Sequence, residues 1–134
     1  MPAHVFAFPD RETVYWHRHV FDLRKPEFAS SAAFHKHLGS MEQFWRDWSG
    51  PAEDLQLKLL QAVELEETYD WGLFCGGECI DGLEEELSVL EEYWRITESD
   101  SQLYDELRQQ LGAVREAIRV ARDIQGILIL ILWE

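Results

Sequence analysis

The sequence predicts an α+β fold, with about four helices packed on a small, mostly antiparallel sheet. Residues 4–8 and 13–23 alternate as strands do, and residues 127–132 form a continuous apolar run. Four segments between them carry apolar residues at helical spacing. At 134 residues, 46% of them apolar and six of them tryptophan, the chain can bury a core without cross-links. We therefore expect residues 1–134 to form a single domain.

The N-terminal segments are expected to pair as a β-hairpin. Residues 4–8 are rich in aromatic side chains, and residues 13–23 form a longer alternating segment. Pro9 and Asp10 between them are typical turn residues, because proline presets φ and aspartate can bond to its own backbone. Pro26 is expected to end the hairpin.

Two helices are expected next. The first runs from a cap at Ser30 or Ser31 to about Trp48, on an apolar stripe formed by Phe34, Leu38, Met41, Trp45 and Trp48. Residues 49–51, with the sequence Ser-Gly-Pro, are expected to stop this helix and to start a second one.

Residues 70–80 break the helical pattern, and their three glycines predict a loop or a tight hairpin. Asp81 followed by Glu84 predicts the N-cap of a third helix. Ser99 and Gln102 are expected to cap a fourth helix, which runs to about Asp123. Its apolar face consists of Leu103, Leu107, Leu111, Val114, Ile118 and Ala121.

The C-terminal segment is predicted to be a strand inside the sheet. Gly126 is expected to end the fourth helix as a C-cap glycine. Residues 127–132 are apolar on both faces, which is typical of a strand that is covered on both sides. At an edge of the sheet such a strand would promote aggregation, so we place it beside the N-terminal hairpin.

The charge of the chain is concentrated in its middle. Residues 53–106 hold seventeen carboxylates, opposed only by Lys58 and Arg95, and so account for the net charge of −14. Such a charge repels nucleic acid and anionic membranes. Four arginines on the fourth helix should face the third helix, and they can neutralise at most four of these acids: Arg108, Arg115, Arg119 and Arg122. Solubility alone needs a net charge of roughly 2–8, so the surplus favours a surface for a basic partner.

The candidate partner-binding residues come from this acidic segment. Two aromatic residues amid the acids are candidate anchors, because aromatic side chains surrounded by charge are typical of interface hot spots. The predicted set is Glu64, Glu66, Glu67, Tyr69, Asp70, Trp71, Glu78, Asp81, Glu85 and Glu92.

Histidines and cysteines give only a minor metal hypothesis. His17 and His19 would share a face of the second strand. His35 and His37 would lie about 200° apart on the first helix, so they could not share an ion there. Cys75 and Cys79 are expected to be ordinary residues, since only a three-residue loop would bring their sulfurs together. No metal or cofactor is therefore assigned.

The function is expected to be binding rather than catalysis. No nucleophile triad, phosphate loop, dinucleotide fingerprint or His-Glu-x-x-His pattern is present. In size, acidity, aromatic content and lack of a catalytic motif, the chain resembles immunity proteins of bacterial toxin systems. The resemblance implies a protein that binds and blocks a cognate toxin, often a basic nuclease.

Three other functions are compatible with the same sequence. An acidic array can imitate DNA phosphates and inhibit a nucleic-acid-binding defence enzyme. A small metal-dependent enzyme could use His17 and His19, with or without the two cysteines. A structural or adaptor subunit could pair residues 127–133 across a dimer. The chain shows no secretory signal and no apolar run that spans a bilayer, so a cytoplasmic location is expected.

Overall fold

The computed structural model of the chain describes residues 2–9, 32–63, 66–67 and 70–132. In order, its elements are β1 (Pro2–Phe8), β2 (Phe34–Ser40), α3 (Met41–Phe44), a π-helical turn η1 (Trp45–Ser49), α4 (Gly50–Asp54), α5 (Lys58–Ala62), β3 (Glu66–Glu67), β4 (Asp70–Gly76), α6 (Glu78–Thr97), α7 (Ser101–Asp123) and β5 (Ile127–Leu132).

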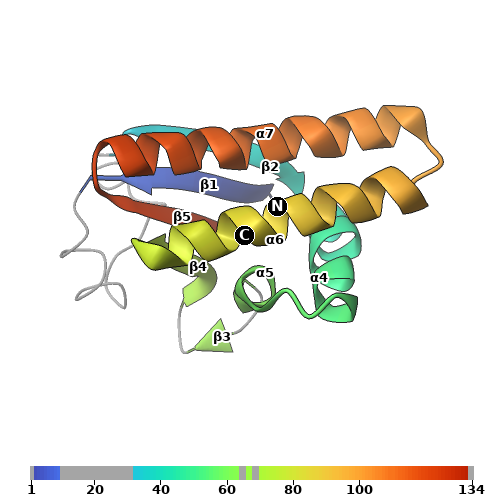
Figure 1. Cartoon of the computed structure of the whole chain (residues 1–134), viewed down its shortest axis with the longest axis horizontal. Helices are drawn as coiled ribbons and strands as arrows, with labels where there is room; N and C mark the ends of the chain where they lie inside the picture. Colours follow the sequence, from blue (N-terminus) through green and yellow to red (C-terminus); the bar gives the residue numbers. More distant parts are fainter. Residues whose placement is uncertain (1, 10–31, 64–65, 68–69, 133–134) are drawn as a thin grey trace.

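The predicted α+β class is confirmed. The sheet has the strand order β2-β1-β5-β4-β3, and each neighbouring pair is antiparallel. Helices α6 and α7 form an antiparallel pair, and α7 lies along the sheet over β1, β2 and β5 (Figure 1). None of the helices in the described ranges combines the length and the apolar composition needed to cross a bilayer.

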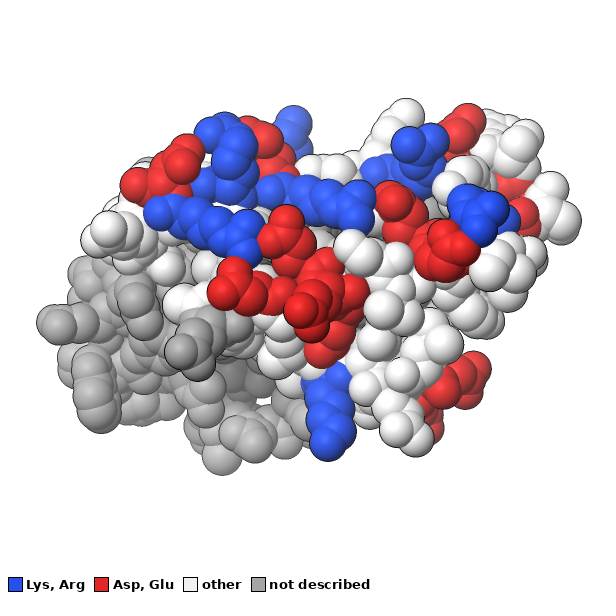
Figure 2. Space-filling view, viewed as in Figure 1, with Lys and Arg blue, Asp and Glu red and all other residues white. Residues whose placement is uncertain are grey.

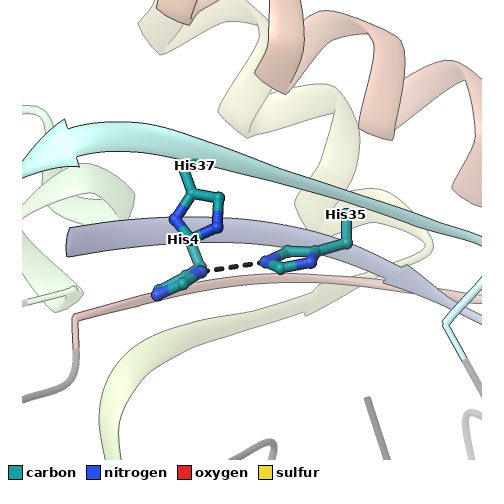
Figure 3. A group of neighbouring side chains, drawn as sticks. All are labelled: His4, His35 and His37. Atoms are coloured by element: carbon teal, nitrogen blue, oxygen red, sulfur yellow. Dashed lines mark hydrogen bonds between the residues drawn. The ribbon is translucent and has the colours of Figure 1, made fainter. Parts of the chain in front are cut away.

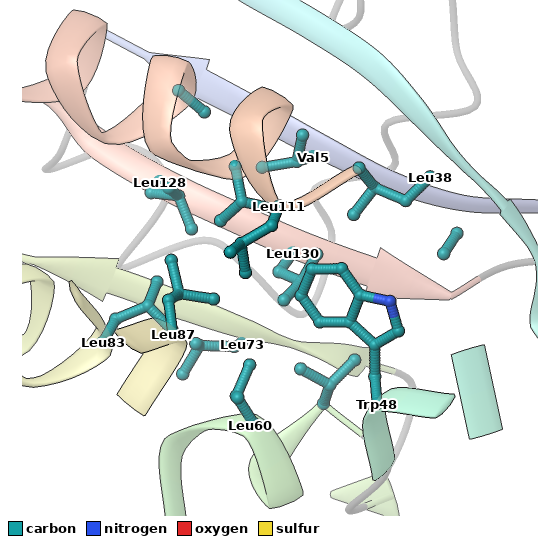
Figure 4. Packing of buried hydrophobic residues seen from close by; sticks show 14 of the residues in the cluster. Val5, Leu38, Trp48, Leu60, Leu73, Leu83, Leu87, Leu111, Leu128 and Leu130 are labelled. Carbon is teal, nitrogen blue, oxygen red and sulfur yellow. The ribbon is translucent and has the colours of Figure 1, made fainter. Parts of the chain in front are cut away.

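β5 lies between β1 and β4, as its sequence predicts. Leu128 and Leu130 point into the main core, among leucines of α6 and α7 and the indole ring of Trp48 (Figure 4). Ile127 and Ile129 belong to a second cluster that includes Phe6 and Phe8 of β1. The side chains of residues 127–130, which lie on both faces, are fully buried, and Ile131 is partly buried. A strand that is apolar throughout therefore sits where both of its faces are buried.

Residues 34–40 form a strand, so the predicted helix from Ser30 or Ser31 is wrong in its first half. The partner of β1 is β2, whereas residues 13–23, predicted to be that partner, lie outside the described residues. Phe34 and Leu38 suggested a helix because they are four residues apart. That spacing also keeps two side chains on one face of a strand, so it does not distinguish the two structures. The helix begins at Met41, and the Ser40 hydroxyl accepts a hydrogen bond from the Gln43 N–H at 3.1 Å.

A new helical element does begin at the predicted boundary, residues 49–51: η1 ends at Ser49, and α4 starts at Gly50 with Pro51 in its first turn. The chain does not break there, however, because the backbone of Ser49 stays helical and its side chain makes no capping hydrogen bond. Pro51 has no N–H to donate to the Asp47 carbonyl, its usual helical acceptor. The indole N–H of Trp94, on α6, donates to that carbonyl instead at 2.7 Å. The helix continues across Pro51 because the indole N–H of Trp94 replaces the donor that proline lacks.

The segment between α5 and α6 contains strands where the sequence predicted a loop or a tight hairpin. β4 pairs with β5 along residues 72–76, and Gly77, with φ of +57°, leads directly into α6. Helix α6 therefore starts at Glu78, and Asp81 is not its N-cap. The N-cap of α7 is Asp100, whose carboxylate accepts the N–H groups of Gln102 and Leu103.

The end of α7 depends on two residues with different roles. A C-cap glycine usually has a positive φ, but here the positive φ, of +52°, is that of Gln125. The Gly126 N–H donates to the Ala121 carbonyl at 2.8 Å and closes the helix end. A Cβ on Gly126 would lie 2.0 Å from the carbonyl oxygen of Phe8. Glycine is therefore needed here for the close approach of the chain to β1.

Candidate functional site

The ten predicted partner-binding residues are distributed over two regions. Asp81, Glu85 and Glu92 lie on α6 with exposed side chains. Glu64 and Tyr69 lie outside the described residues. The remaining five are placed by their backbone on β3, on β4 and at the start of α6: Glu66, Glu67, Asp70, Trp71 and Glu78.

The β3–β4 pair brings four of the predicted residues together at one edge of the sheet. β3 is the last strand in the order, and its register places Glu66 opposite Trp71 and Glu67 opposite Asp70. Two acidic positions therefore face each other across the strand pair. We call these four residues the acidic edge.

The acidic side chains of α6 are largely bound within the protein. Arg115 pairs with Glu91 at 3.0 Å, and Arg122 pairs with Asp81 at 2.5 Å and with Glu84 at 2.7 Å. Hydrogen bonds to these last two carboxylates raise the pKa of Arg122 above its ordinary value. Basic side chains of α7 accordingly lie beside the acidic side chains of α6 (Figure 2).

The other two arginines of the predicted stripe do not pair with α6 among the described residues. Arg119 pairs with Glu116 and Asp123 on its own helix. Arg108 lies over the ring of Tyr104, 5.7 Å from its centre. Half of the stripe therefore has the role that the sequence predicted.

Two further glutamates of α6 have local partners. Glu92 pairs with Arg95 one turn along the helix, and the hydrogen bond between them lowers the pKa of the Glu92 carboxyl. Glu86 accepts the backbone N–H groups of Leu59 and Leu60, each at 3.0 Å, and so caps α5. Glu85 makes no ion pair or side-chain hydrogen bond within the part of the chain that the structure describes.

Cys75 and Cys79 form a disulfide, although the sequence favoured ordinary cysteines. The expectation treated residues 76–77 as the loop of a hairpin, whereas Gly76 ends β4 and Gly77 links it directly to α6. This turn brings the two Cα atoms to 5.4 Å, within the range for a disulfide. The bond joins the end of β4 to the first turn of α6.

Three histidines meet on β1 and β2. His4 lies opposite His37 in the strand register, and His35 lies two residues before His37 on the same face. The His4 Nδ1 and His35 Nε2 atoms share a hydrogen bond at 2.9 Å (Figure 3). The ring of His37 is centred 4.5 Å from that of His4 and 5.2 Å from that of His35. We call these three residues the histidine cluster.

The rings of the cluster differ in exposure. His4 is 3% exposed, whereas His35 and His37 are exposed. Burial of the ring, together with the neighbouring rings of His37 and His35, lowers the pKa of His4 to about 4. The pKa of His35 is also lowered, first by partial burial of its ring and then by His37.

The sequence missed this cluster because it assigned residues 34–40 to a helix. The expectation that His35 and His37 cannot share an ion is therefore wrong for the strand that forms. The pattern His-x-His at residues 35–37 could have indicated the cluster, because side chains two residues apart lie on the same face of a strand. His17 and His19, the metal candidates that the sequence suggests, lie outside the described residues.

Comparison of the chain with protein-family models, with curated proteins and with solved structures finds no match.

Proposed function

We propose that the protein binds a cationic protein through its acidic middle segment and acts as a stoichiometric inhibitor, in the manner of immunity proteins. The observation that carries this proposal is the excess of seventeen carboxylates over two basic residues in residues 53–106. Across the residues whose side chains the structure describes, carboxylates still outnumber lysines and arginines two to one. Such a surface speeds association with a basic partner and makes it sensitive to salt.

The acidic edge is the proposed centre of this surface. The strand register places two acidic residues, Glu67 and Asp70, at opposed positions. A cationic group of a partner would meet two acidic positions of the sheet there. Trp71 in the same strand pair provides an aromatic residue for the centre of the interface.

The acidic residues of α6 can contribute to the partner-binding surface although most of them form ion pairs. Side chains of the Arg122–Asp81 and Arg95–Glu92 pairs are between 42% and 71% exposed. Water screens ion pairs that are this exposed, so they contribute little to stability and a partner arginine can replace the internal one at small cost. Glu85 is available without any such exchange.

Charge reversal tests the proposal. A Glu64→Lys, Glu66→Lys, Glu67→Lys variant should capture its partner from the native host far less well than the wild-type chain. The control reverses three acids of the neutral N-terminal segment, Glu12, Asp22 and Glu27, and so changes the net charge equally. The association rate of the wild-type chain with the captured partner should fall steeply as the salt concentration rises. Relative to the wild-type chain, the first variant should show a fall in association rate at least tenfold larger than that of the control. Equal losses in the two variants would contradict a localised site.

The partner's chemistry separates the inhibitor from the other binding functions. Competition between this protein and DNA for one site on the partner would identify a DNA mimic. A partner that is not basic, or binding that does not depend on salt, would contradict the electrostatic mechanism. Sedimentation of the isolated chain as a dimer would favour the adaptor subunit.

A cytoplasmic location is part of the proposal. Glutathione and thioredoxin keep thiols reduced in that compartment, so Cys75 and Cys79 should be thiols there and should oxidise on isolation. Alkylation in intact cells before lysis measures their state. A fully oxidised pair in the cell would place the protein in an oxidising compartment instead.

A further inference from the structure

The histidine cluster has the donor atoms and the spacing of a metal site. Each of the three residues offers a ring nitrogen, and these nitrogens all lie within 4.8 Å of one another. Zinc–nitrogen bonds of 2.0–2.1 Å in tetrahedral geometry place two imidazole nitrogens roughly 3.3 Å apart. The contact of 2.9 Å between His4 and His35 and the outer limit of 4.8 Å bracket this value. Small side-chain rotations would therefore bring three nitrogens to bonding distance of one ion.

The fold holds the rings close to this arrangement before any ion arrives. The backbone register fixes His4 opposite His37. The ring of His35 stacks on that of Phe6, with centres 4.2 Å apart and planes within 1°. His4 is buried in the sheet face, so its ring cannot turn away into solvent. Two ligands on one strand and a third on its neighbour need no movement of the backbone to converge.

We propose that His4, His35 and His37 bind one divalent transition-metal ion, with zinc as the best match to three imidazole ligands. Hard cations such as magnesium and calcium prefer oxygen ligands, and none of the three donors is an oxygen. Three protein ligands leave one tetrahedral position open. Because His35 and His37 are exposed, that position is reached from solvent and takes a water molecule or an external ligand.

The proposed ion would also link β1 to the edge strand β2. His4 and His35 are 31 residues apart in the chain, and the segment between them includes residues that the structure does not describe. An ion that binds only the folded arrangement stabilises it in proportion to its concentration. Zinc should therefore raise the unfolding temperature of the full chain, and a chelator should reverse the rise.

The test is a titration of the metal-free full chain with Zn²⁺ at pH 7.5, followed by calorimetry or by competition with a coloured chelator. We expect one ion per chain. We expect His35→Ala and His37→Ala each to weaken binding by at least 10–100-fold, the loss that follows from removing even a supporting residue of a metal site. Both side chains are exposed, so these variants should fold, and circular dichroism of the metal-free proteins checks this. Binding by either variant within threefold of the wild-type chain would overturn the proposal.

Two further variants decide which histidines form the site. His4→Phe keeps an aromatic ring at the buried position and should lose at least tenfold in affinity. Unchanged affinity would mean that a surface His-x-His pair binds alone, and would refute the three-residue site. The control is a His17→Ala, His19→Ala double variant, which removes two histidines outside the cluster and should bind zinc as the wild-type chain does. A loss there would refute the assignment to His4, His35 and His37.

A measurement without substitutions covers the case in which His4→Phe does not fold. Nitrogen-15 NMR of the imidazole rings in the wild-type chain counts the rings whose signals shift on binding Zn²⁺. Three shifted rings, from His4, His35 and His37, are expected. Any other set would contradict the proposal.

Discussion

Glu86 should be a structural residue despite its position in an acidic run. Its two carboxylate oxygens accept the N–H groups of Leu59 and Leu60, each at 3.0 Å. These groups lie at the start of α5, a five-residue helix whose N-cap, Leu57, has no side-chain acceptor. Leu60 is fully buried, so its N–H cannot bond to water instead when Glu86 is removed.

The expected cost of Glu86→Ala is about 2–4 kcal/mol. Hydrogen bonds to a charged acceptor contribute about 1.5–3 kcal/mol each, which gives an upper limit of about 6 kcal/mol for two. The carboxylate of Glu86 is only partly buried, so solvent reduces this figure. Glu86→Gln keeps one acceptor oxygen but turns an amide group toward the second N–H, and it should lose roughly half as much.

Urea unfolding of the two variants and the wild-type chain measures these differences in the free energy of unfolding. The slope should stay constant while the midpoint falls. Glu85→Ala is the matched control, because it removes the same charge from an adjacent exposed position and should change stability by less than about 0.5 kcal/mol. A Glu86→Ala variant as stable as Glu85→Ala would refute the capping role. The same pair serves the binding proposal, since Glu85→Ala should weaken partner capture without loss of stability.

Substitution of either of two glycines, and reduction of the disulfide, should also change the stability of the fold. Gly126→Ala should destabilise the fold by about 1–3 kcal/mol, because its Cβ would lie 2.0 Å from the Phe8 carbonyl oxygen. Gly112→Ala should instead stabilise α7 by up to about 1 kcal/mol, because no atom lies within 4 Å of the added Cβ. Urea midpoints of the two variants that shift in the same direction would contradict this. Reduction of the Cys75–Cys79 disulfide, which closes a short loop, should lower the free energy of unfolding by about 2 kcal/mol. A Cys75→Ser, Cys79→Ser variant should unfold at the same midpoint with or without reductant.

The pattern of apolar residues was enough to predict the elements that bury one face, such as α7, or both faces, such as β5. Six residues were predicted to form the buried face of α7. Leu103, in its first turn, is only partly buried, and the other five are buried: Leu107, Leu111, Val114, Ile118 and Ala121. Residues 127–132 are apolar on both faces, and only a central strand could bury them. Burial of apolar surface is the dominant favourable term in folding, so segments with one way to bury their side chains are readable from sequence.

The roles of the three consecutive glutamates of α6, residues 84–86, could not be predicted from the sequence pattern. Glu84 pairs with Arg122, Glu85 is exposed, and Glu86 caps a helix 27 residues earlier in the chain. The three residues are adjacent and chemically identical. Their roles differ because successive positions on a helix point in directions about 100° apart, toward elements that come from elsewhere in the sequence.

The histidine cluster depended most fully on the tertiary structure. The spacing of Phe34 and Leu38 suits both a helix and a strand, and only pairing with β1 makes the segment a strand. Backbone hydrogen bonds of a helix are local, whereas those of a strand need a partner that the segment itself does not specify. Once β1 supplies that partner, His35 and His37 share a face and His4 lies opposite them. The sequence supplied the three histidines, and only the pairing of β1 with β2 decided that they meet.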